Sequence, residues 1–414
     1  MNRILLTGNA AAAWGARLAD VDYIPAFPIT PQTEIIELLA TWCNQGDLPA
    51  RLVTMESEHA MLTTAAAAAA TGVRVFTATS SQGLLYAMEM LYTVPGWRVP
   101  FVLVNVSRGL ASPVTLESDH NDVLATRDTG FLHLICSTVQ EVLDSVIIAF
   151  RLAEDPRVRL PVLVNLDGFV LSFTREPVEL PSPEQVHAFL PPFDPGEIRF
   201  RASTPISQAV AVLGGGLYSY FRYETHLAAL GALDVYDEIA AEFATRFGRE
   251  HKAVESYEAD DAEIVFFAMG AFATKAQDAV DQLRASGRRV GLVRLRLLRP
   301  YPVVALRQAL GGKRAVAVID QNLSMGKGGV LATELASALY GTADPPLLAS
   351  YVGGLGGRDI SAEELYEIAE RTLQAAHDGI TPPPRLLYTA GELRQVRQLQ
   401  TIAWAERATL GGSS

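Results

Sequence analysis

The chain has 414 residues, of which 49% are hydrophobic and 19% charged, and its formal net charge at pH 7 is −12. A chain of this length exceeds one ordinary core, so two or three domains are expected, and its composition is that of a well-packed globular protein. The acidic balance and the lack of a basic run argue against nucleic acid as a partner. No apolar run reaches the roughly 18 residues that a membrane-spanning helix requires, so we expect no membrane partner.

Short apolar stretches alternate with helical stretches from residue 1 to about 170, which predicts an α/β fold with a mostly parallel sheet. Strands are expected at 3–7, 23–26, 52–55, 73–77, 101–105, 133–136 and 161–166. Helices are expected at 9–19, 31–44, 59–71, 83–94 and 139–154. Five prolines between 181 and 195 indicate an extended or irregular segment, and helical periodicity returns at 223–251. We therefore expect a first domain over 1–257 with an irregular excursion at about 177–220.

An acidic stretch at 258–261 marks a change of composition and opens a second α/β domain, expected over 258–378. Its strands are expected at 263–269, 289–294, 315–319 and 347–352, and its helices at 272–286, before 310, at 330–340 and at 362–377. Residues 379–414 are interpreted as a C-terminal arm that packs on another surface and frays at 411–414. The two cysteines, Cys43 and Cys136, are outside any CxxC pair. We expect buried free thiols in a reducing compartment, the cytoplasm.

Residues 51–83 combine features that are typical of a ligand site. A short apolar strand ends in two carboxylates, Glu56 and Glu58, and the helix that follows contains six consecutive alanines, 65–70. The carboxyl end of a strand is where open α/β sheets bind ligands, and small side chains let a backbone or a flat ligand approach closely. The alternative is that Glu58 is only a first-turn carboxylate favoured by the helix dipole.

Short motifs precede and follow this stretch in a fixed order. They are PITPQTE at 28–34, MESEH at 55–59, TSSQG at 79–83, NVSRG at 105–109, SDHND at 118–122, RDTG at 127–130, LDGF at 166–169, LRPYP at 298–302, DQNLSMGKGG at 320–329, GGLGGRD at 353–359 and GITP at 379–382. Together they resemble the α subunit of the 2-oxoacid:ferredoxin oxidoreductases, of which pyruvate:ferredoxin oxidoreductase is the best-known member. The likeness covers nearly the whole chain. It implies a thiamine diphosphate pyrimidine-binding-type domain followed by a transketolase C-terminal-like domain.

The resemblance implies thiamine diphosphate chemistry and assigns roles to residues of these motifs. Glu58 matches the glutamate that hydrogen-bonds the pyrimidine N1′ of the cofactor, and Glu56 stays open as the alternative carboxylate. Arg108 matches the arginine that binds the substrate carboxylate, the alternative being an ion pair with Asp119 or Asp122. Thr30 matches a contact to the substrate, or is the N-cap of the next helix. Further cofactor contacts are implied for Pro28, Ile29, Ser81 and Gln82.

No metal ligands are expected in this chain. Thiamine diphosphate needs a divalent metal held through a Gly-Asp-Gly motif and a later Asn, and no Gly-Asp-Gly occurs. The resemblance implies a β subunit that supplies the diphosphate and Mg²⁺ side of the site. It also implies γ- and δ-type subunits, with the iron–sulfur clusters in partner subunits only, because a cluster requires about four thiolates and this chain has two cysteines. Alone, the chain is expected to be inactive.

The implied activity is oxidative decarboxylation of a 2-oxoacid, pyruvate first, with coenzyme A to an acyl-CoA and CO2, with electrons to ferredoxin in anaerobic metabolism. One alternative is the same chemistry on a bulkier acid such as phenylglyoxylate, with NAD reduced through a flavoprotein subunit. Another is a non-catalytic transketolase-like scaffold. Gly109 stands where family members often carry Ala, and Ala10 replaces a common glutamate. The glycine leaves the substrate open, because it is expected to give a side-chain pocket the room of a methyl group.

Overall fold

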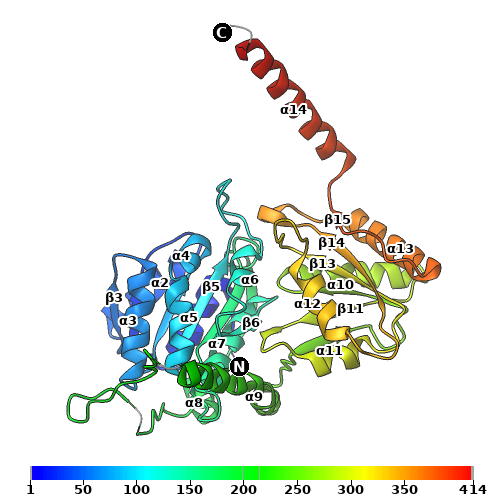
Figure 1. The fold of residues 1–414 in the computed structure, drawn as a ribbon. Helices are drawn as coiled ribbons and strands as arrows, with labels where there is room; N and C mark the ends of the chain where they lie inside the picture. The colour runs from blue at the N-terminus through cyan, green and yellow to red at the C-terminus, as the bar shows by residue number, and fades with distance from the viewer. Residues whose placement is uncertain (1, 198, 214, 412–414) are drawn as a thin grey trace.

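The computed structural model describes residues 2–197, 199–213 and 215–411. It shows two α/β units side by side, with a C-terminal helix that extends away from the second unit (Figure 1). The strands of the first unit are β1 (Asn2–Thr7), β2 (Tyr23–Ala26), β3 (Arg51–Thr54), β4 (Phe76–Thr79), β5 (Val102–Ser107), β6 (Leu132–Ile135), β7 (Val162–Asp167) and β8 (Arg175–Leu180). Its helices are α1 (Gly8–Leu18), α2 (Thr33–Gln45), α3 (Glu58–Ala70), α4 (Ser81–Tyr86), α5 (Met88–Trp97), α6 (Asn121–Ala125), α7 (Val139–Glu154), α8 (Pro183–Phe189) and α9 (Gly215–Phe247).

The central sheet of the first unit has the order β12-β6-β7-β5-β4. Strands β4 to β7 are parallel, as expected, and β12 (Leu297–Arg299) is added antiparallel to β6. The pair β2-β3 is also parallel and meets this sheet through a bridge between Tyr23 and Val75. The strand β1 is not part of the parallel sheet, because it pairs antiparallel with β8. The mostly parallel α/β fold is thus confirmed, with an antiparallel pair at its side.

Three predictions in the first unit were wrong in detail. The helix expected at 83–94 is divided into α4 and α5, because Ala87 between them has a non-helical backbone (φ −90°, ψ 11°). The proline-rich stretch 181–195, expected to be irregular, contains α8, and β8 ends directly before it. Helix α8 forms because Ser182 and Gln185 make a capping box and Pro183 occupies the first helical turn, where proline is tolerated. Helix α9 begins at Gly215, earlier than the expected start at 223, and Gly214 lies outside the described residues.

The second unit is a six-stranded sheet in the order β15-β14-β13-β10-β11-β9. Its strands are β9 (Val254–Tyr257), β10 (Ile264–Ala268), β11 (Val290–Leu295), β13 (Ala315–Asp320), β14 (Leu347–Val352) and β15 (Arg385–Leu386). Its helices are α10 (Phe272–Ala285), α11 (Val303–Leu310), α12 (Val330–Leu339) and α13 (Ala362–Asp378). All pairings are parallel except β9 with β11. Strand β9 lies before residue 258 but belongs to the sheet of the second unit. Strand β12 lies after residue 258 but belongs to the sheet of the first unit. The domain division at 258 stays a prediction.

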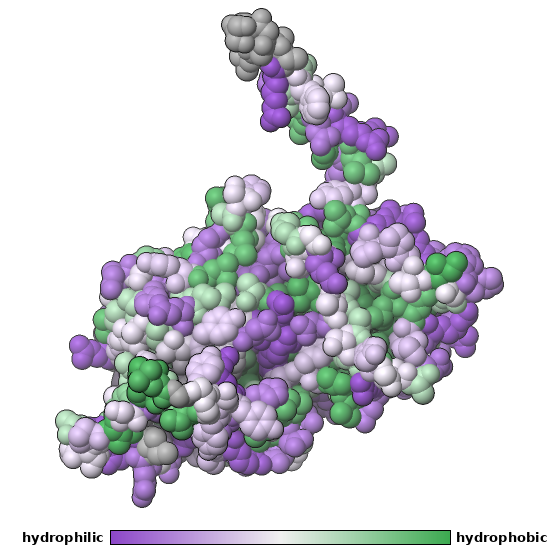
Figure 2. Space-filling model, viewed as in Figure 1, coloured by the Kyte–Doolittle hydropathy of each residue, from purple (hydrophilic) through white to green (hydrophobic). Residues whose placement is uncertain are grey.

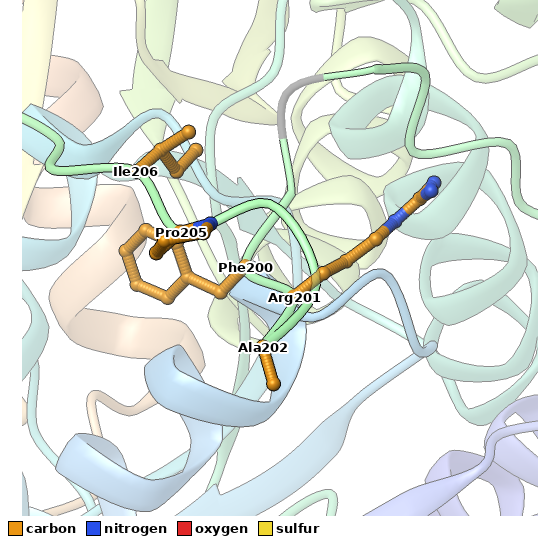
Figure 3. Close-up of a pocket in the computed structure, with 5 residues that line it drawn as sticks. All are labelled: Phe200, Arg201, Ala202, Pro205 and Ile206. Carbon is orange, nitrogen blue, oxygen red and sulfur yellow. The ribbon is translucent and has the colours of Figure 1, made fainter.

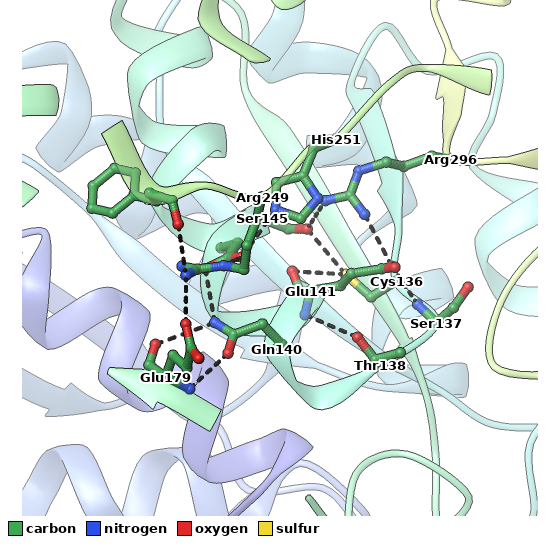
Figure 4. A network of polar contacts seen from close by, with 12 residues as sticks. Cys136, Ser137, Thr138, Gln140, Glu141, Ser145, Glu179, Arg249, His251 and Arg296 are labelled. Carbon is green, nitrogen blue, oxygen red and sulfur yellow. Dashed lines mark hydrogen bonds and ion pairs between the residues drawn. The ribbon is translucent and has the colours of Figure 1, made fainter. Parts of the chain in front are cut away.

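A buried ionic network at the first turn of α7 joins the two units (Figure 4). Arg296 is fully buried and lies 2.9 Å from the Glu141 carboxylate, which also pairs with Arg294 at 2.8 Å. Although burial alone raises the pKa of Glu141, the two guanidinium groups overcome this and lower it to about 2. The ion pairs therefore hold Glu141 charged inside the protein, where an unpaired charge would be costly.

Residues after β15 form helix α14 (Ala390–Gly411), and residues 412–414, which include most of the stretch expected to fray, lie outside the described residues. Across the described part of the chain, no helix combines the length and apolar character needed to cross a membrane. The expectation that the arm packs on another surface remains a prediction.

Candidate active site

Glu58 is the first residue of α3, at the carboxyl end of β3. The Ser57 side chain accepts a hydrogen bond from the Ala60 amide and so fixes the start of the helix. The Glu58 side chain is buried, whereas Glu56 is exposed. Among the described residues no group hydrogen-bonds the Glu58 carboxylate. Because no donor among the described residues occupies this carboxylate, it is available to a ligand that brings one.

Gly83 lies directly against this carboxylate. A β-carbon built on Gly83 would stand 2.4 Å from Glu58 Oε1 and 2.7 Å from Thr79 Oγ1. The Thr79 hydroxyl is buried and also has no hydrogen-bond partner in the described part of the chain. The absence of a side chain at residue 83 is therefore what lets the Glu58 carboxylate sit where it does. Sequence reasoning missed both Gly83 and Thr79, although they are the ends of the TSSQG motif.

The alanine-rich part of α3 serves this chain's own core. Ala65, Ala66 and Ala69 are buried together with side chains of α5 such as Leu91 and Val94. The close approach that small side chains permit is used by neighbouring elements of the same unit. A ligand is not needed to explain the alanine run, so the site lies at the amino end of α3 alone.

Arg108 follows β5 and is largely buried. Its guanidinium donates to the Thr30 carbonyl at 2.7 Å and to Gln82 Oε1 at 2.5 Å, and its Nε has no hydrogen-bond partner among the described residues. No carboxylate lies within 4.0 Å of it among the described residues, so the alternative of an ion pair with a nearby aspartate is wrong. Burial lowers the pKa of Arg108, and the charge of Asp122 only partly opposes this. A buried guanidinium held by neutral acceptors suits an anionic ligand.

The start of α4 joins Glu58 to Arg108. Gln82 accepts the hydrogen bond from Arg108, and the next residue, Gly83, is the one against Glu58. Ser81 has a left-handed backbone (φ 48°), and its hydroxyl donates to Gln82 Oε1 at 2.7 Å. Such strain in a residue other than glycine persists only where the surroundings impose it. The two predicted functional side chains therefore flank a single turn of chain.

Asp122 holds this turn in place. Its Oδ2 accepts from the Ser81 amide at 3.1 Å and from the Arg108 amide at 3.2 Å. Its Oδ1 accepts from the Ser107 hydroxyl at 2.5 Å. Burial raises the pKa of Asp122, although hydrogen bonds from Ser107 and Asn105 oppose the shift. Asp122 was considered only as a possible ion-pair partner, because its backbone contacts cannot be read from sequence spacing.

The segment before α2 supplies a backbone contact to the site. The Thr30 carbonyl accepts from Arg108, while the Thr30 side chain and Pro28 are exposed and Ile29 is half-buried. The helix begins at Thr33 with Gln32 at its N-cap, so Thr30 is not the cap, and that alternative was wrong. An exposed hydroxyl beside Arg108 leaves the proposed ligand contact of Thr30 open.

The neighbouring segment 118–122 connects the site to the second unit. His120 is buried, its Nε2 lies 2.7 Å from Asp167 Oδ1, and its amide donates to the Gln321 carbonyl. Burial lowers the pKa of His120, but Asp167 and other carboxylates outweigh this and raise it. The Gly356 amide donates to Asp119 Oδ2 at 3.2 Å. The SDHND, DQN and GGLGG motifs thus form one interface between the units.

Gly109 was expected to leave room for a substrate side chain. A β-carbon at Gly109 would instead meet Thr115 Cγ2 at 2.6 Å and Asp119 Oδ2 at 3.1 Å. The space beside this glycine is therefore filled by the loop 110–119 of the same chain. The expectation of an empty pocket was wrong. The direction in which a β-carbon on Gly109 would point depends on how the backbone turns after β5, and the alternating pattern of the strand does not determine it.

Other features bear on cofactors and ligands. In the described ranges no group of three or more His, Cys, Asp or Glu is arranged to hold a metal. Cys136 is buried and burial raises its pKa to about 12, whereas Cys43 is only half-buried, contrary to expectation.

A cavity of about 280 Å³ at Phe200–Ile206 is lined by five residues (Figure 3). It lies where Phe200 bonds to Ala70, the far end of α3 from Glu58.

Comparison with known proteins gives consistent matches. Residues 14–241 match the family described as pyruvate flavodoxin/ferredoxin oxidoreductase, thiamine diphosphate-binding, and 262–365 match core domain II of pyruvate:ferredoxin oxidoreductase. The pyruvate synthase subunit PorA of Pyrococcus abyssi is 37% identical over 92% of this chain and 96% of its own. That of Methanothermobacter thermautotrophicus is 39% identical over 89% and 94%. The ketoisovalerate oxidoreductase subunit VorA of Pyrococcus horikoshii is 38% identical over 91% and 95%.

Solved structures share the fold at lower identity. A 2-oxoglutarate:ferredoxin oxidoreductase from Magnetococcus marinus superposes with a TM-score of 0.69 and 21% identity, over 90% of this chain and 65% of that longer one. A split-gene transketolase in an inactive tetramer gives a TM-score of 0.52 and 14% identity, over 87% of this chain and 97% of its own. Both likenesses concern the fold alone, and they bear out the expected transketolase-like architecture.

Proposed function

The chain belongs to the pyruvate:ferredoxin oxidoreductase family, and from this premise we propose that it is the α-type subunit of a multi-subunit 2-oxoacid oxidoreductase. The proposed reaction is the oxidative decarboxylation of a 2-oxoacid with coenzyme A to an acyl-CoA and CO2. The electron pair released from the 2-oxoacid passes to ferredoxin through iron–sulfur clusters of partner subunits. Pyruvate is the first candidate substrate, because several relatives are named pyruvate synthase subunits.

The observation that carries the proposal is the buried Glu58 carboxylate, which has no partner among the described residues and rests against Gly83. A second residue, Arg108, lies on the other side of the same turn of chain, and its Nε has no hydrogen-bond partner among the described residues. A proton-exchanging carboxylate and a guanidinium with a vacant donor, placed together at the carboxyl ends of β3 and β5, suit a ligand that needs a proton partner and carries a carboxylate.

These residues fit the pyrimidine side of thiamine diphosphate. When bound, this cofactor supplies the nucleophilic carbon and the electron sink for decarboxylation. Glu58 would hold a proton at the pyrimidine nitrogen that faces it, and Thr79 offers a second buried polar atom beside it. Gly83, with no side chain, lets the Glu58 carboxylate take the position from which it would face the ring. Ser81 and Gln82 would line the space for the ring and keep the turn in position.

Arg108 would bind the carboxylate of the 2-oxoacid. The two bonds that it already makes, to Thr30 O and to Gln82 Oε1, fix the plane of the guanidinium, and its buried Nε has no hydrogen-bond partner among the described residues. Its side chain is therefore oriented before the substrate arrives, which reduces the entropy lost on binding. The exposed Thr30 hydroxyl would contact the substrate next to that carboxylate.

The diphosphate side of the site is proposed to come from a β subunit with its Mg²⁺. The chain has no Gly-Asp-Gly motif, and its described residues include no group of three or more metal-ligating side chains. The site would thus be completed between subunits, with γ- and δ-type subunits serving electron transfer. Isothermal calorimetry on the chain without partners should detect very weak binding of thiamine diphosphate. Tight, magnesium-dependent binding to the lone chain would contradict the shared site.

A substrate screen tests the proposed reaction. The purified complex is supplied with coenzyme A and a viologen dye, and dye reduction is measured with pyruvate, 2-ketoisovalerate and 2-oxoglutarate in turn. We expect reduction with a 2-oxoacid only when coenzyme A is present, fastest with pyruvate. A faster rate with 2-ketoisovalerate would assign the chain to the VorA-like relatives. Failure with every 2-oxoacid would overturn the proposal. The relatives give no support for phenylglyoxylate, and we do not propose it.

A further inference from the structure

The second unit supplies no residue to the candidate active site. The residues assigned to that site, from Thr30 to Asp122, all belong to the first unit. The two units nevertheless lie side by side with their surfaces in contact (Figures 1 and 2). Segment 118–122 is bonded both to the second unit and, through Asp122, to the turn of chain that carries the site. This segment therefore connects the docking of the second unit with the geometry of the site.

Four consecutive residues of the segment bind two loops of the second unit, 321–323 and 355–357. The bonds are Ser118 O with the Gly357 amide at 2.8 Å, Asp119 Oδ2 with the Gly356 amide at 3.2 Å, the His120 amide with Gln321 O at 2.8 Å, and Asn121 Oδ1 with Asn322 Nδ2 at 2.9 Å and the Leu323 amide at 3.1 Å. The loops follow β13 and β14, which are adjacent parallel strands, so they lie at the same edge of the second sheet. That edge holds the segment along most of its length.

The side chain of Asn121 holds the loop that leads into α12. Its Oδ1 accepts two hydrogen bonds from this loop, one from a side chain and one from the backbone. Asn322, one of the two donors, is buried, and its own Oδ1 accepts from the amide of Val330, the first residue of α12, at 3.0 Å. The loop is thus fixed to the start of α12 and gives Asn121 a firm attachment to the second unit.

The second unit also packs against His120 from another direction. The Nε2 atom of His120 lies 2.7 Å from Asp167 Oδ1, and Asp167 Oδ2 accepts from the Ala271 amide at 2.6 Å. Gly270, which has a left-handed backbone (φ 75°), precedes this amide. A β-carbon on Gly270 would stand 2.6 Å from Asp167 Oδ2 and 2.8 Å from His120 Nε2. The turn before α10 therefore approaches the segment as closely as a glycine allows.

Asp122, the next residue after Asn121, carries this position into the site. It is fully buried, and one oxygen of its carboxylate accepts from the amides of both Ser81 and Arg108. Because a single oxygen binds both amides, it fixes the separation of the two stretches of chain that carry Gln82 and Arg108. Gln82 in turn accepts from the Arg108 guanidinium. A shift of Asp122 would therefore move the guanidinium together with its support.

We propose that the second unit positions Arg108 for the substrate carboxylate, with Asn121 as a positioning residue that acts through Asp122. The inference rests on the proposed function, because it gives the docking of the second unit a use in binding the 2-oxoacid. A displaced guanidinium weakens binding of the carboxylate and leaves the proton-exchanging Glu58 in place. The effect should therefore fall on KM and not on kcat.

Steady-state kinetics of the assembled complex test this role. Asn121→Leu keeps the size of the side chain but removes the acceptor, so KM for the preferred 2-oxoacid should rise about tenfold. The value of kcat and the KM for coenzyme A should stay within about twofold. Asn121→Asp keeps an accepting oxygen and should retain the unaltered KM. Asn121→Ala, a second variant without the acceptor, should show the same rise as Asn121→Leu.

Glu334→Ala is the matched control for a contact between the units. Glu334 on α12 pairs with Arg127 at 3.3 Å and with Arg299 at 2.9 Å, and neither partner belongs to segment 118–122. Loss of these pairs weakens the interface without acting on Asp122, so KM should stay unchanged. Subunit composition is measured for every variant, so that assembly and positioning are separated.

Hydrogen exchange of the same complexes measures the transmission without turnover. The Ser81 and Arg108 amides both donate to Asp122. Peptides covering 79–86 and 105–110 should therefore exchange several-fold faster in Asn121→Leu, and at the unaltered rate in Asn121→Asp and Glu334→Ala.

An unchanged KM in Asn121→Leu would overturn the proposal. So would an equal rise of KM in Glu334→Ala, or faster exchange confined to 320–332, because either result would make the contact of Asn121 merely structural. An unaltered complex that reduced no dye with any 2-oxoacid would instead overturn the proposed function. The exchange rates at Ser81 and Arg108 would then still decide whether the second unit sets their position.

Discussion

The Glu58 carboxylate lies directly against the backbone of Gly83, so that a β-carbon on Gly83 would stand 2.4 Å from Glu58 Oε1. Gly83→Ala should therefore displace the carboxylate. A misplacement of about 1 Å in a catalytic group costs on the order of a hundredfold in rate. We expect kcat to fall by about that factor in the assembled complex. Gly96→Ala is the matched control, since nothing lies within 4 Å of a β-carbon there, and it should leave kcat unchanged.

The role of Arg108 predicts a loss common to all 2-oxoacids. A hydrogen bond to a charged group contributes about 1.5–3 kcal/mol, so Arg108→Ala should lower kcat/KM about 10- to 150-fold, mainly through a higher KM. Pyruvate and 2-ketoisovalerate should lose the same factor, because both carry the carboxylate. Steady-state kinetics with both acids measure this. A loss confined to one acid would place Arg108 at the substrate side chain instead.

The position of Gly109 predicts an effect on the loop and not on selectivity. An added methyl group would press on Thr115 Cγ2 at 2.6 Å, so Gly109→Ala should lower kcat/KM for small and bulky 2-oxoacids by the same factor. Thr115→Ser removes the Cγ2 methyl and keeps the hydroxyl that accepts from the Glu117 amide. The double variant should regain most of the activity. A change in the ratio between the two acids would return Gly109 to the substrate pocket.

The buried ion pairs of Glu141 with Arg294 and Arg296 predict that the protein loses stability in acid. The folded-state pKa of Glu141 is about 2, below its ordinary value of 4.5. Its contribution, about 3 kcal/mol from this difference, is fully present above pH 4.5 and is lost as the pH falls toward 2. Glu141→Gln should lower the free energy of unfolding by about 3–5 kcal/mol at pH 7 and weaken its dependence on acid.

Urea unfolding at pH 7 and pH 4 measures both effects. Glu242→Gln provides the control, because Glu242 forms an exposed pair with Arg246 on α9 and should cost less than about 1 kcal/mol. If both variants lost the same free energy of unfolding, the buried Glu141 pairs would stabilise the protein no more than an exposed ion pair does, which would contradict the prediction.

Most of the fold could be predicted from periodicity. Helix α7 (Val139–Glu154) and strand β14 (Leu347–Val352) have the predicted bounds, because long apolar patterns leave little choice. The failures have local or long-range causes. Helix α8 was missed because its capping box outweighs a high proline content, and β12 was missed because its partner β6 is far away in the sequence.

The site could be predicted only as a set of motifs. The order of the motifs pointed to Glu58 and Arg108, and the structure places Gln82 and Gly83 between them. The support around them could not be read from the sequence. Asp122 acts through backbone amides, and the direction of a β-carbon at Gly83 or Gly109 depends on the folded backbone. The catalytic assignments themselves remain predictions.

The turnover of the complete complex carrying Glu58→Gln tests the central claim most directly. The substitution keeps the size of the side chain but removes its capacity to exchange a proton, so 2-oxoacid-dependent viologen reduction should fall by about a hundredfold or more. Subunit composition should be unchanged, and Glu56→Gln, at the exposed neighbouring carboxylate, should retain nearly the full rate. Retention of a large share of turnover in Glu58→Gln, or an equal loss in Glu56→Gln, would contradict the account.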